Sequence, residues 1–285
     1  MNLSRLIIRP MLESDIDAGL RLSVSEGWNQ TKEDWKFLIS CKKNICIVAE
    51  YDDEIIGTTT AINYGNEIAW IGMVLVDKSF RGSGVSKLLL GDIFEKLALI
   101  KSVKLDATPA GQKVYSKFGF KEEYSITRMV NSSVTPISSN DELIMPGSKN
   151  DIPQMIELDK NVFGADRTLL IESLTKNFPR KAFVLKRNDR IESFALGRDG
   201  NKYDHIGPVI ASSVEDAKSL ICKALKALEH KPVVADVLSD KKELISFLEA
   251  MDFVKQREFI RMYKNENIFP GTPDKYYLIC GPEFG

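Results

Sequence analysis

The residue types best suited to chemistry lie in one stretch, VLVDKSFRGSGVSKLLL, at residues 74–90. The pattern predicts an apolar strand, a basic glycine-bearing turn (RGSG) and the start of an apolar helix. Such a turn points several backbone N–H groups at one spot, where the helix dipole also favours negative charge. Glycines allow close approach and Arg81 adds a cation. The stretch is a candidate pyrophosphate site, and the alternative is a tight connection that binds nothing.

Metal and dinucleotide chemistry are not favoured by the rest of the sequence. The four cysteines are scattered with no C-x-x-C pair, and with two histidines the spacing assembles no zinc cluster. No metal is therefore expected. The turn also lacks the third glycine of the Rossmann fingerprint G-x-G-x-x-G, which argues against NAD binding.

Composition sets the class of protein. The chain has 285 residues, of which 44% are hydrophobic and 28% charged, which is typical of a globular protein with two domains. Its 39 basic and 40 acidic residues give a net charge of −1, so no overall field recruits nucleic acid or an anionic membrane. We find no signal-peptide core and no apolar run of about 18 residues that would span a membrane. A cytoplasmic protein is expected, with its oligomeric state open.

Strands and helices alternate around the turn. A hairpin is expected around Asp52-Asp53, because two β-rich runs flank this pair. Further strands are expected at residues 6–9, 67–77, 103–108 and 124–130. Helices are expected after the cap residues Ser14 and Asp15, and at residues 86–100 and 110–119. The pattern predicts an α/β (α+β) fold.

The second half of the chain repeats the order of the first. RPMLESDI resembles MPGSKNDI, and IVAEYDDEIIG resembles FVLKRNDRIES. AWIGMV resembles DHIGPV, and GFKEEYSITRM resembles DFVKQREFIRM. Between the copies lies a segment rich in Ser, Asn and Pro, which suits a linker. We therefore predict two copies of one module, at residues 1–132 and 141–285, joined by a linker at residues 133–140.

The motifs resemble the GNAT superfamily of N-acetyltransferases, whose signature Q/R-x-x-G-x-G/A binds the pyrophosphate of acetyl-CoA. Arg81 and Gly84 match this signature, and Ser86 departs from its last position. The segments GWNQTKEDW, LDATPAGQKVYSKFGF and GPEFG are similar to a subgroup with two GNAT-like domains in tandem. The resemblance implies two such domains, each a mixed, mostly antiparallel sheet flanked by helices.

The resemblance also implies a binding site for acetyl-CoA as co-substrate. Backbone groups at Val74 and Val76 would pair with the pantetheine arm, as an added strand pairs with a sheet edge. The pyrophosphate would be held by Arg81, Gly82, Ser83, Gly84, Val85 and Ser86.

Two residues are candidates for proton transfer. Tyr115 stands where the family often places a tyrosine that protonates the departing thiolate, and the alternative is a core aromatic packed near Phe118. Asp106 alternates with Leu105 and Ala107, so it faces the opposite side of its strand. It is a candidate base or ammonium anchor, and the alternative is a helix cap or a salt bridge.

Other residues are candidates for the acceptor site. Trp28, Asn29 and Trp35 lie in the region where the family builds its acceptor pocket, although tryptophans at this spacing are also typical of a core. Arg128 and Arg261, in the repeated Arg-Met pair, are candidates to bind a substrate carboxylate. Solvated strand arginines are the alternative.

The second copy lacks the expected chemistry. PVIASSVEDA stands in place of the glycine turn, and Leu248 falls where Tyr115 would be. We do not expect this copy to bind acetyl-CoA. Our hypothesis is that it closes the acceptor site of the first copy, with residues such as Asp204, His205 or Asp236.

The resemblance therefore implies an acetyl-CoA-dependent N-acetyltransferase with an active N-terminal domain and a degenerate C-terminal one. A neutral amine of a small-molecule or amino-acid-like acceptor would attack the thioester directly, which requires no histidine. Two alternatives stay open: a CoA-binding sensor or interaction module without turnover, and acetylation of a protein or peptide amine.

Overall fold

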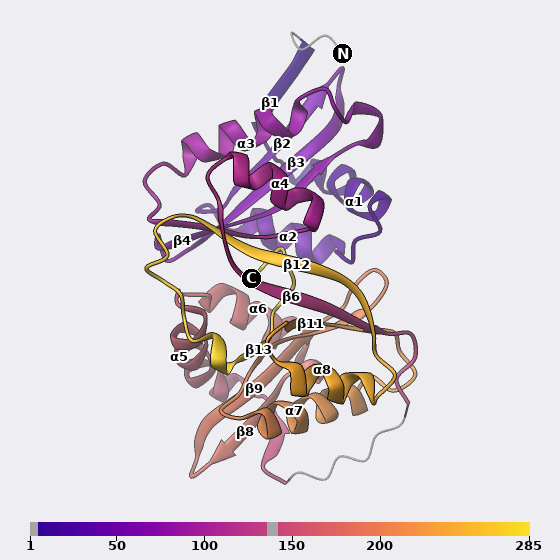
Figure 1. The fold of residues 1–285 in the computed structure, drawn as a ribbon, viewed down its shortest axis with the longest axis vertical. Coiled ribbons are helices and arrows are strands. Elements are labelled where there is room, and N and C mark those ends of the chain that lie inside the picture. Colours follow the sequence, from indigo (N-terminus) through magenta and orange to yellow (C-terminus); the bar gives the residue numbers. More distant parts are fainter. Residues whose placement is uncertain (1–4, 136–141) are drawn as a thin grey trace.

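The computed structural model describes residues 5–135 and 142–285. Within them, one continuous sheet of 13 strands crosses both halves in the order β1-β2-β3-β4-β5-β12-β6-β11-β13-β10-β9-β8-β7 (Figure 1). Most neighbours are antiparallel and helices cover both faces, so the predicted fold class is confirmed. The linker predicted at residues 133–140 falls mostly outside the described residues, and the domain boundaries stay a prediction.

The N-terminal half contains the predicted elements in their predicted order, with one further helix at residues 32–40 that was not predicted separately. It contains β1 (Leu6–Pro10), α1 (Ile16–Ser25), α2 (Lys32–Ser40), β2 (Ile45–Tyr51), β3 (Glu54–Tyr64), β4 (Ile68–Val76), α3 (Val85–Lys96), β5 (Ser102–Ala107), α4 (Pro109–Lys117) and β6 (Lys121–Asn131). The β2–β3 hairpin turns at Asp52 and Asp53, whose φ angles of 52° and 62° are those of a tight two-residue turn. Helix α3 ends at Lys96, earlier than predicted.

The C-terminal half repeats this order. It contains β7 (Ile144–Pro146), α5 (Ile152–Phe163), α6 (Thr168–Asn177), β8 (Phe183–Arg187), β9 (Arg190–Arg198), β10 (Asp204–Ile210), α7 (Val214–Lys226), β11 (Val233–Leu238), α8 (Lys242–Glu249), β12 (Val254–Asn265) and β13 (Tyr276–Leu278). The β8–β9 hairpin turns at Asn188 and Asp189, again with positive φ. Asp15 and Asp151 both accept a backbone N–H at 2.8 Å ahead of the first helix of their half. The two copies are thus alike in local detail.

The halves exchange strands, which the sequence analysis did not predict. Strand β12 lies between β5 and β6, and β6 in turn pairs with β11. Figure 1 shows β6 and β12 running side by side where the two halves meet. The repeated strands carry the same alternating pattern, so local sequence does not decide whether a strand pairs within its own half or with the other.

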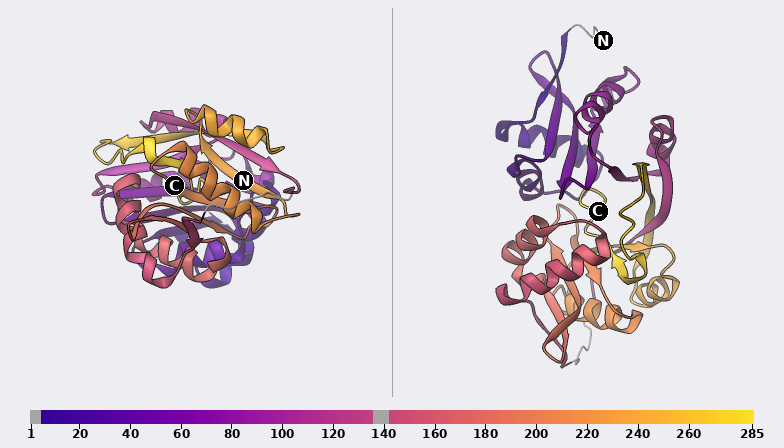
Figure 2. Two further views of the ribbon diagram at one scale, coloured as in Figure 1. Left: turned by 90° about the horizontal axis from the view of Figure 1, so that it is seen from below. Right: turned by 90° about the vertical axis from the view of Figure 1, so that its left-hand side faces the viewer.

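Three apolar clusters hold the layers together. One spans both halves beneath α1, α2, α5 and α6, and includes Trp35, Trp70 and Phe194. On the opposite face, α3 and α4 cover the N-terminal half, while α7 and α8 cover the C-terminal half. The chain end lies where the two halves meet (Figure 2). Within the described ranges no helix is long and apolar enough to cross a membrane.

Candidate active site

Strands β4 and β5 separate part-way along their length. They pair in parallel only from Ile68–Trp70 to Ser102–Lys104. Beyond that point a bulge bends β4 at Met73, whose φ is 51°. A cavity lies where the two strands have parted, with residues 71–74 of β4 and residues 105–107 of β5 in its walls. The split therefore exposes backbone that a regular sheet would pair.

The glycine turn lies open at the start of α3. Gly82 and Gly84 have φ angles of 77° and 90°, and a Cβ at either position would meet no atom within 4 Å. Arg81 is half-exposed and its Nη2 lies 2.6 Å from a carboxylate oxygen of Glu26. Val85 buries its side chain in the core and leaves its backbone at the helix start. An open turn of this shape fits a pyrophosphate, provided that Arg81 exchanges Glu26 for the ligand.

Both halves of the chain build the wall of the cavity. The N-terminal half supplies Trp28, Gln30, Ile71, Gly72, Met73, Val74, Leu105, Asp106, Ala107, Thr108, Gly111, Tyr115 and Arg128. The C-terminal half supplies Arg257 and Phe259 of β12, and Pro282 and Glu283 of the last residues.

Tyr115 faces the cavity from α4, which begins where Thr108 caps the helix by accepting the N–H of Gly111 at 3.2 Å. Its ring centroid lies 5.9 Å from that of Phe120. The phenol forms no hydrogen bond with any residue that the structure describes, and burial raises its pKa. At neutral pH the hydroxyl therefore keeps its proton and is free to donate it.

Asp106 is held by an arginine from the other half. Nε and Nη2 of Arg261 each lie 2.9 Å from one of its carboxylate oxygens. Arg261 also contacts the hydroxyl of Tyr124, and its guanidinium lies 4.5 Å from the ring centroid of Trp70. The salt-bridge alternative for Asp106 therefore holds, and its two oxygens are engaged. Arg261 is buried, so it is not the solvated strand arginine considered above.

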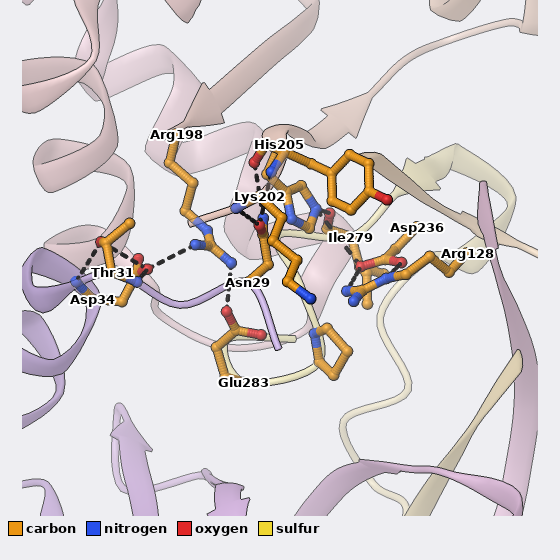
Figure 3. Close-up of polar contacts among 12 residues, drawn as sticks. Asn29, Thr31, Asp34, Arg128, Arg198, Lys202, His205, Asp236, Ile279 and Glu283 are labelled. Atoms are coloured by element: carbon orange, nitrogen blue, oxygen red, sulfur yellow. Dashed lines mark hydrogen bonds and ion pairs between the residues drawn. The ribbon is translucent and has the colours of Figure 1, made fainter. Parts of the chain in front are cut away.

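Arg128 is engaged in the same way by Asp236, with two contacts of 2.7 Å (Figure 3). It lines the cavity but is buried and ion-paired, not solvated. His205 Nε2 lies 3.7 Å from Asp236, and burial together with Arg198 lowers the pKa of His205 to about 3, so this imidazole is neutral. Neither His205 nor Asp236 lines the cavity.

The other residues predicted for the acceptor site lie in different environments. Trp28 lines the cavity. Asn29 instead joins the halves, because its Oδ1 accepts the N–H groups of Lys202 and Tyr203 at 2.9 and 3.0 Å (Figure 3). Trp35 has no exposed surface and packs in the core. Asn29 and Trp35, which were predicted for the acceptor pocket, therefore do not line this cavity.

Asp204 also lies outside the cavity wall, paired with Lys181 at 2.6 Å and Lys231 at 3.3 Å. None of the three residues suggested for closing the site, Asp204, His205 and Asp236, lines this cavity. The C-terminal half does line the cavity, but with Arg257, Phe259, Pro282 and Glu283. Within the sequence, only the GPEFG segment pointed toward any of these residues.

The corresponding split in the C-terminal half is filled by the chain itself. Strands β10 and β11 pair in parallel at residues 204–206 and 233–235, and β13 then pairs with both. Ser213 begins α7 by accepting the N–H of Asp216, where the N-terminal half has Gly84. Leu248 is buried in the core. An extended segment thus occupies the place where the first half is open.

Comparison with known families accounts for both halves. Residues 42–122 match a family described as "Acetyltransferase (GNAT) domain", and residues 155–278 match a second family of the same description. Together these matches cover well over half of the chain. The chain belongs to the GNAT acetyltransferases. It is an N-acetyltransferase with two GNAT domains in tandem, as the resemblance implied.

Relatives of this tandem GNAT protein span its length. "Holothin acyltransferase" of Pseudoalteromonas sp. (strain SANK 73390) is 23% identical over 264 residues, which is 92% of this chain and 89% of the relative. "Uncharacterized N-acetyltransferase YitH" of Bacillus subtilis (strain 168) is 23% identical, covering 86% and 87%. The crystal structure of a putative acetyltransferase from Pyrococcus horikoshii has a TM-score of 0.83 at 22% identity, covering 100% and 98%, and so shares the fold.

Proposed function

We propose that this GNAT acetyltransferase moves the acetyl group of acetyl-CoA to the amine of a small-molecule or amino-acid-like acceptor. The open split between β4 and β5 is the main support, because it combines unpaired strand backbone with the glycine turn and with Tyr115. Residues 81–86 would bind the pyrophosphate through backbone N–H groups and Arg81. The backbone at Val74 and Val76 would pair with the pantetheine arm, in the way that β13 pairs with β10 in the other half.

The residues in the cavity suit direct transfer. A neutral amine attacks the thioester carbonyl, a C–N bond forms and the C–S bond breaks. Tyr115 donates its proton to the departing sulfur, because burial raises its pKa and keeps the hydroxyl protonated at neutral pH until the sulfur takes on charge. Backbone N–H groups at the β4 bulge stabilise the negative charge that develops on the carbonyl oxygen. Asp106, with both oxygens on Arg261, shapes the wall and is not a free base.

The make-up of the cavity wall supports a small acceptor. Its wall combines residues of the first half with Arg257, Phe259, Pro282 and Glu283 of the second. An acceptor held on several sides by both halves is limited in size, whereas a protein lysine or N-terminus would need an open groove.

The test is thiol release from acetyl-CoA with a panel of amino acids, polyamines, aminosugars and short peptides. We expect release above background hydrolysis with at least one small amine, and weaker acetyl-CoA binding by calorimetry in Arg81→Ala. Tight binding of acetyl-CoA without release for any amine would contradict the proposal and favour a sensor. Release with peptides alone would favour a protein or peptide acceptor.

A further inference from the structure

Three polar groups in the cavity wall have no protein partner among the described residues. The Oε2 atom of Glu283 and the Oε1 atom of Gln30 are both buried without a hydrogen bond, in residues that are 3% and 5% exposed. The guanidinium of Arg257 lies in the same wall without an ion pair. A buried polar atom without a partner is costly, so groups of this kind in the wall of a cavity are candidates for contact with a ligand. Here two acceptors and one cationic donor meet in one cavity.

The charges around Glu283 favour an additional cation. Arg198 lies between two carboxylates: its Nη1 is 2.9 Å from Asp34, and its Nη2 contacts Oε1 of Glu283 (Figure 3). One guanidinium thus serves two buried carboxylates. Burial raises the pKa of Asp34, Arg198 lowers it, and the nearby carboxylate of Glu283 raises it again. A ligand ammonium at the free Oε2 of Glu283 would supply the missing positive charge.

Arg257 carries a charge opposite in sign to that of Glu283. Its neighbour Arg128 is already paired with Asp236, so that carboxylate is not available to Arg257. Burial and the nearby Arg128 lower the pKa of Arg257, although a guanidinium remains a cation at neutral pH. Arg257 therefore presents an unpaired positive charge to the cavity, which suits a carboxylate.

The last residues of the chain are fixed beside the β4 bulge, which places Glu283 near the proposed reaction. Trp70 Nε1 donates to the carbonyl of Pro282 at 2.9 Å, and the Tyr64 hydroxyl donates to that of Phe284 at 2.8 Å. Gly72 leaves room for this segment, because a Cβ there would lie 3.2 Å from the Cα of Glu283. Strand β4 and the segment are therefore in direct contact one residue from the bulge.

We infer that the acceptor carries an ammonium and a carboxylate, with the ammonium bound by Glu283 and Gln30 and the carboxylate by Arg257. This inference rests on the proposed acetyl transfer and names its substrate class. Glu283 Oε2 takes the first proton from the ammonium, and the neutral nitrogen then attacks the thioester. The nitrogen loses its second proton as the C–S bond breaks, the sulfur gains a proton from Tyr115, and one proton in all leaves to solvent. Glu283 is thus a catalytic residue supplied by the C-terminal half.

Matched pairs of acceptors test the carboxylate. L-leucine and isopentylamine, L-phenylalanine and phenethylamine, and L-lysine and cadaverine differ within each pair by one carboxylate. We expect kcat/KM to favour at least one amino acid over its amine by about 10- to 100-fold, as for a charge-assisted pair. In Arg257→Gln this preference should disappear through a higher KM. Arg190→Gln, at an exposed arginine of β9, is the matched control and should keep it.

A charge-only substitution tests Glu283. In Glu283→Gln the contact with Arg198 can persist, and we expect kcat to fall by about 100-fold at pH 7 and to recover as pH rises toward the pKa of the free amine. Glu249→Gln, at an exposed glutamate of α8, should leave the pH profile unchanged. A pH-independent loss in Glu283→Gln would mean a structural role only and would overturn the assignment of the base.

The remaining outcomes separate the inference from the proposed function. Acetylation of amines with no preference for a carboxylate would overturn the inference and leave acetyl transfer standing. No thiol release with any amine would overturn the proposed function. Calorimetry of the same acceptor pairs with the CoA-saturated protein then tests the inference without turnover. Weaker binding of every amino acid than of its matched amine would overturn the inference. Tighter binding of the amino acid that is lost in Arg257→Gln would support it.

Discussion

Arg261 of the C-terminal half holds Asp106 of the N-terminal half in a two-armed ion pair, with both contacts at 2.9 Å. The two residues are directly opposite each other in the β12–β5 ladder, just as Arg128 and Asp236 are in the β6–β11 ladder. Each arginine of the repeated Arg-Met pair thus reaches an aspartate of the other half. This reciprocal arrangement follows from the strand exchange, and it places two buried ion pairs close to the cavity.

Breaking the first of these pairs should destabilise the whole protein. We expect Arg261→Met to lower the free energy of unfolding by about 3–5 kcal/mol, because it leaves the Asp106 carboxylate buried without a partner. The double variant Asp106→Asn/Arg261→Met should lose less than the sum of the two single variants. Equilibrium urea unfolding measures all three. Additive losses would mean that the pair is not coupled.

Removing the hydroxyl of Tyr115 should affect the chemical step. We expect Tyr115→Phe to lower kcat by about 100-fold, since no other proton donor contacts the departing sulfur in the proposed reaction. Calorimetric affinity for acetyl-CoA should stay unchanged, because the ring is retained. Tyr263→Phe, on β12 outside the cavity wall, is the control. Unchanged turnover in Tyr115→Phe would remove this residue from the mechanism.

Alanine substitutions at two glycines in and before α3 should have opposite effects on stability. Gly84 has a φ of 90°, so Gly84→Ala should cost about 1–2 kcal/mol of stability and weaken acetyl-CoA binding by about tenfold or more. Gly91 lies inside α3 with open space around it, so Gly91→Ala should stabilise the protein by up to about 1 kcal/mol without changing affinity. Thermal unfolding and calorimetry measure both effects. Equal affinity in the two variants would argue against cofactor binding at the turn.

His205 should make the protein less stable at mildly acidic pH. Its pKa is lowered by burial to about 3, against about 6.5 in an unfolded chain, so between these values only the unfolded state binds the proton. Stability therefore falls as pH falls through this window, by about 2 kcal/mol from pH 7 to 5 for this group. In urea unfolding, the free energy of unfolding should depend less steeply on pH in His205→Gln than in the wild type. His230→Gln, at the other and exposed histidine, should keep the wild-type slope.

The sequence was sufficient for most elements of the N-terminal half and for their order, but not for α2. The glycine turn, the Asp52-Asp53 hairpin and the repeated blocks depend on neighbouring residues, which local propensity describes well. Strand exchange depends on whether a strand pairs with its own half of the sheet or with the equivalent strand of the other half, which local sequence does not decide. Deleting residues 141–285 to obtain an independent first domain would therefore also remove β12 from between β5 and β6.

The candidate site was predicted only where it lies in one continuous motif. Tyr115 and Trp28 belong to segments with a recognisable pattern, and both line the cavity. Arg257 and Glu283 come from distant parts of the chain, and nothing in the residues around them marks a polar atom as lacking a partner. The ion pair of Arg128 was not predicted, because its partner Asp236 lies 108 residues away and no local pattern relates the two.

The exchanged strands also determine how the molecule can move. Rotating one half against the other would break the backbone hydrogen bonds of the β12–β5 and β6–β11 pairs, together with two buried ion pairs. Many two-domain enzymes admit and enclose their substrates by a hinge motion between the domains. The shared sheet does not allow such a motion in this protein. We therefore expect substrates to enter and leave through adjustments of side chains and loops around the cavity, without rotation of one half against the other.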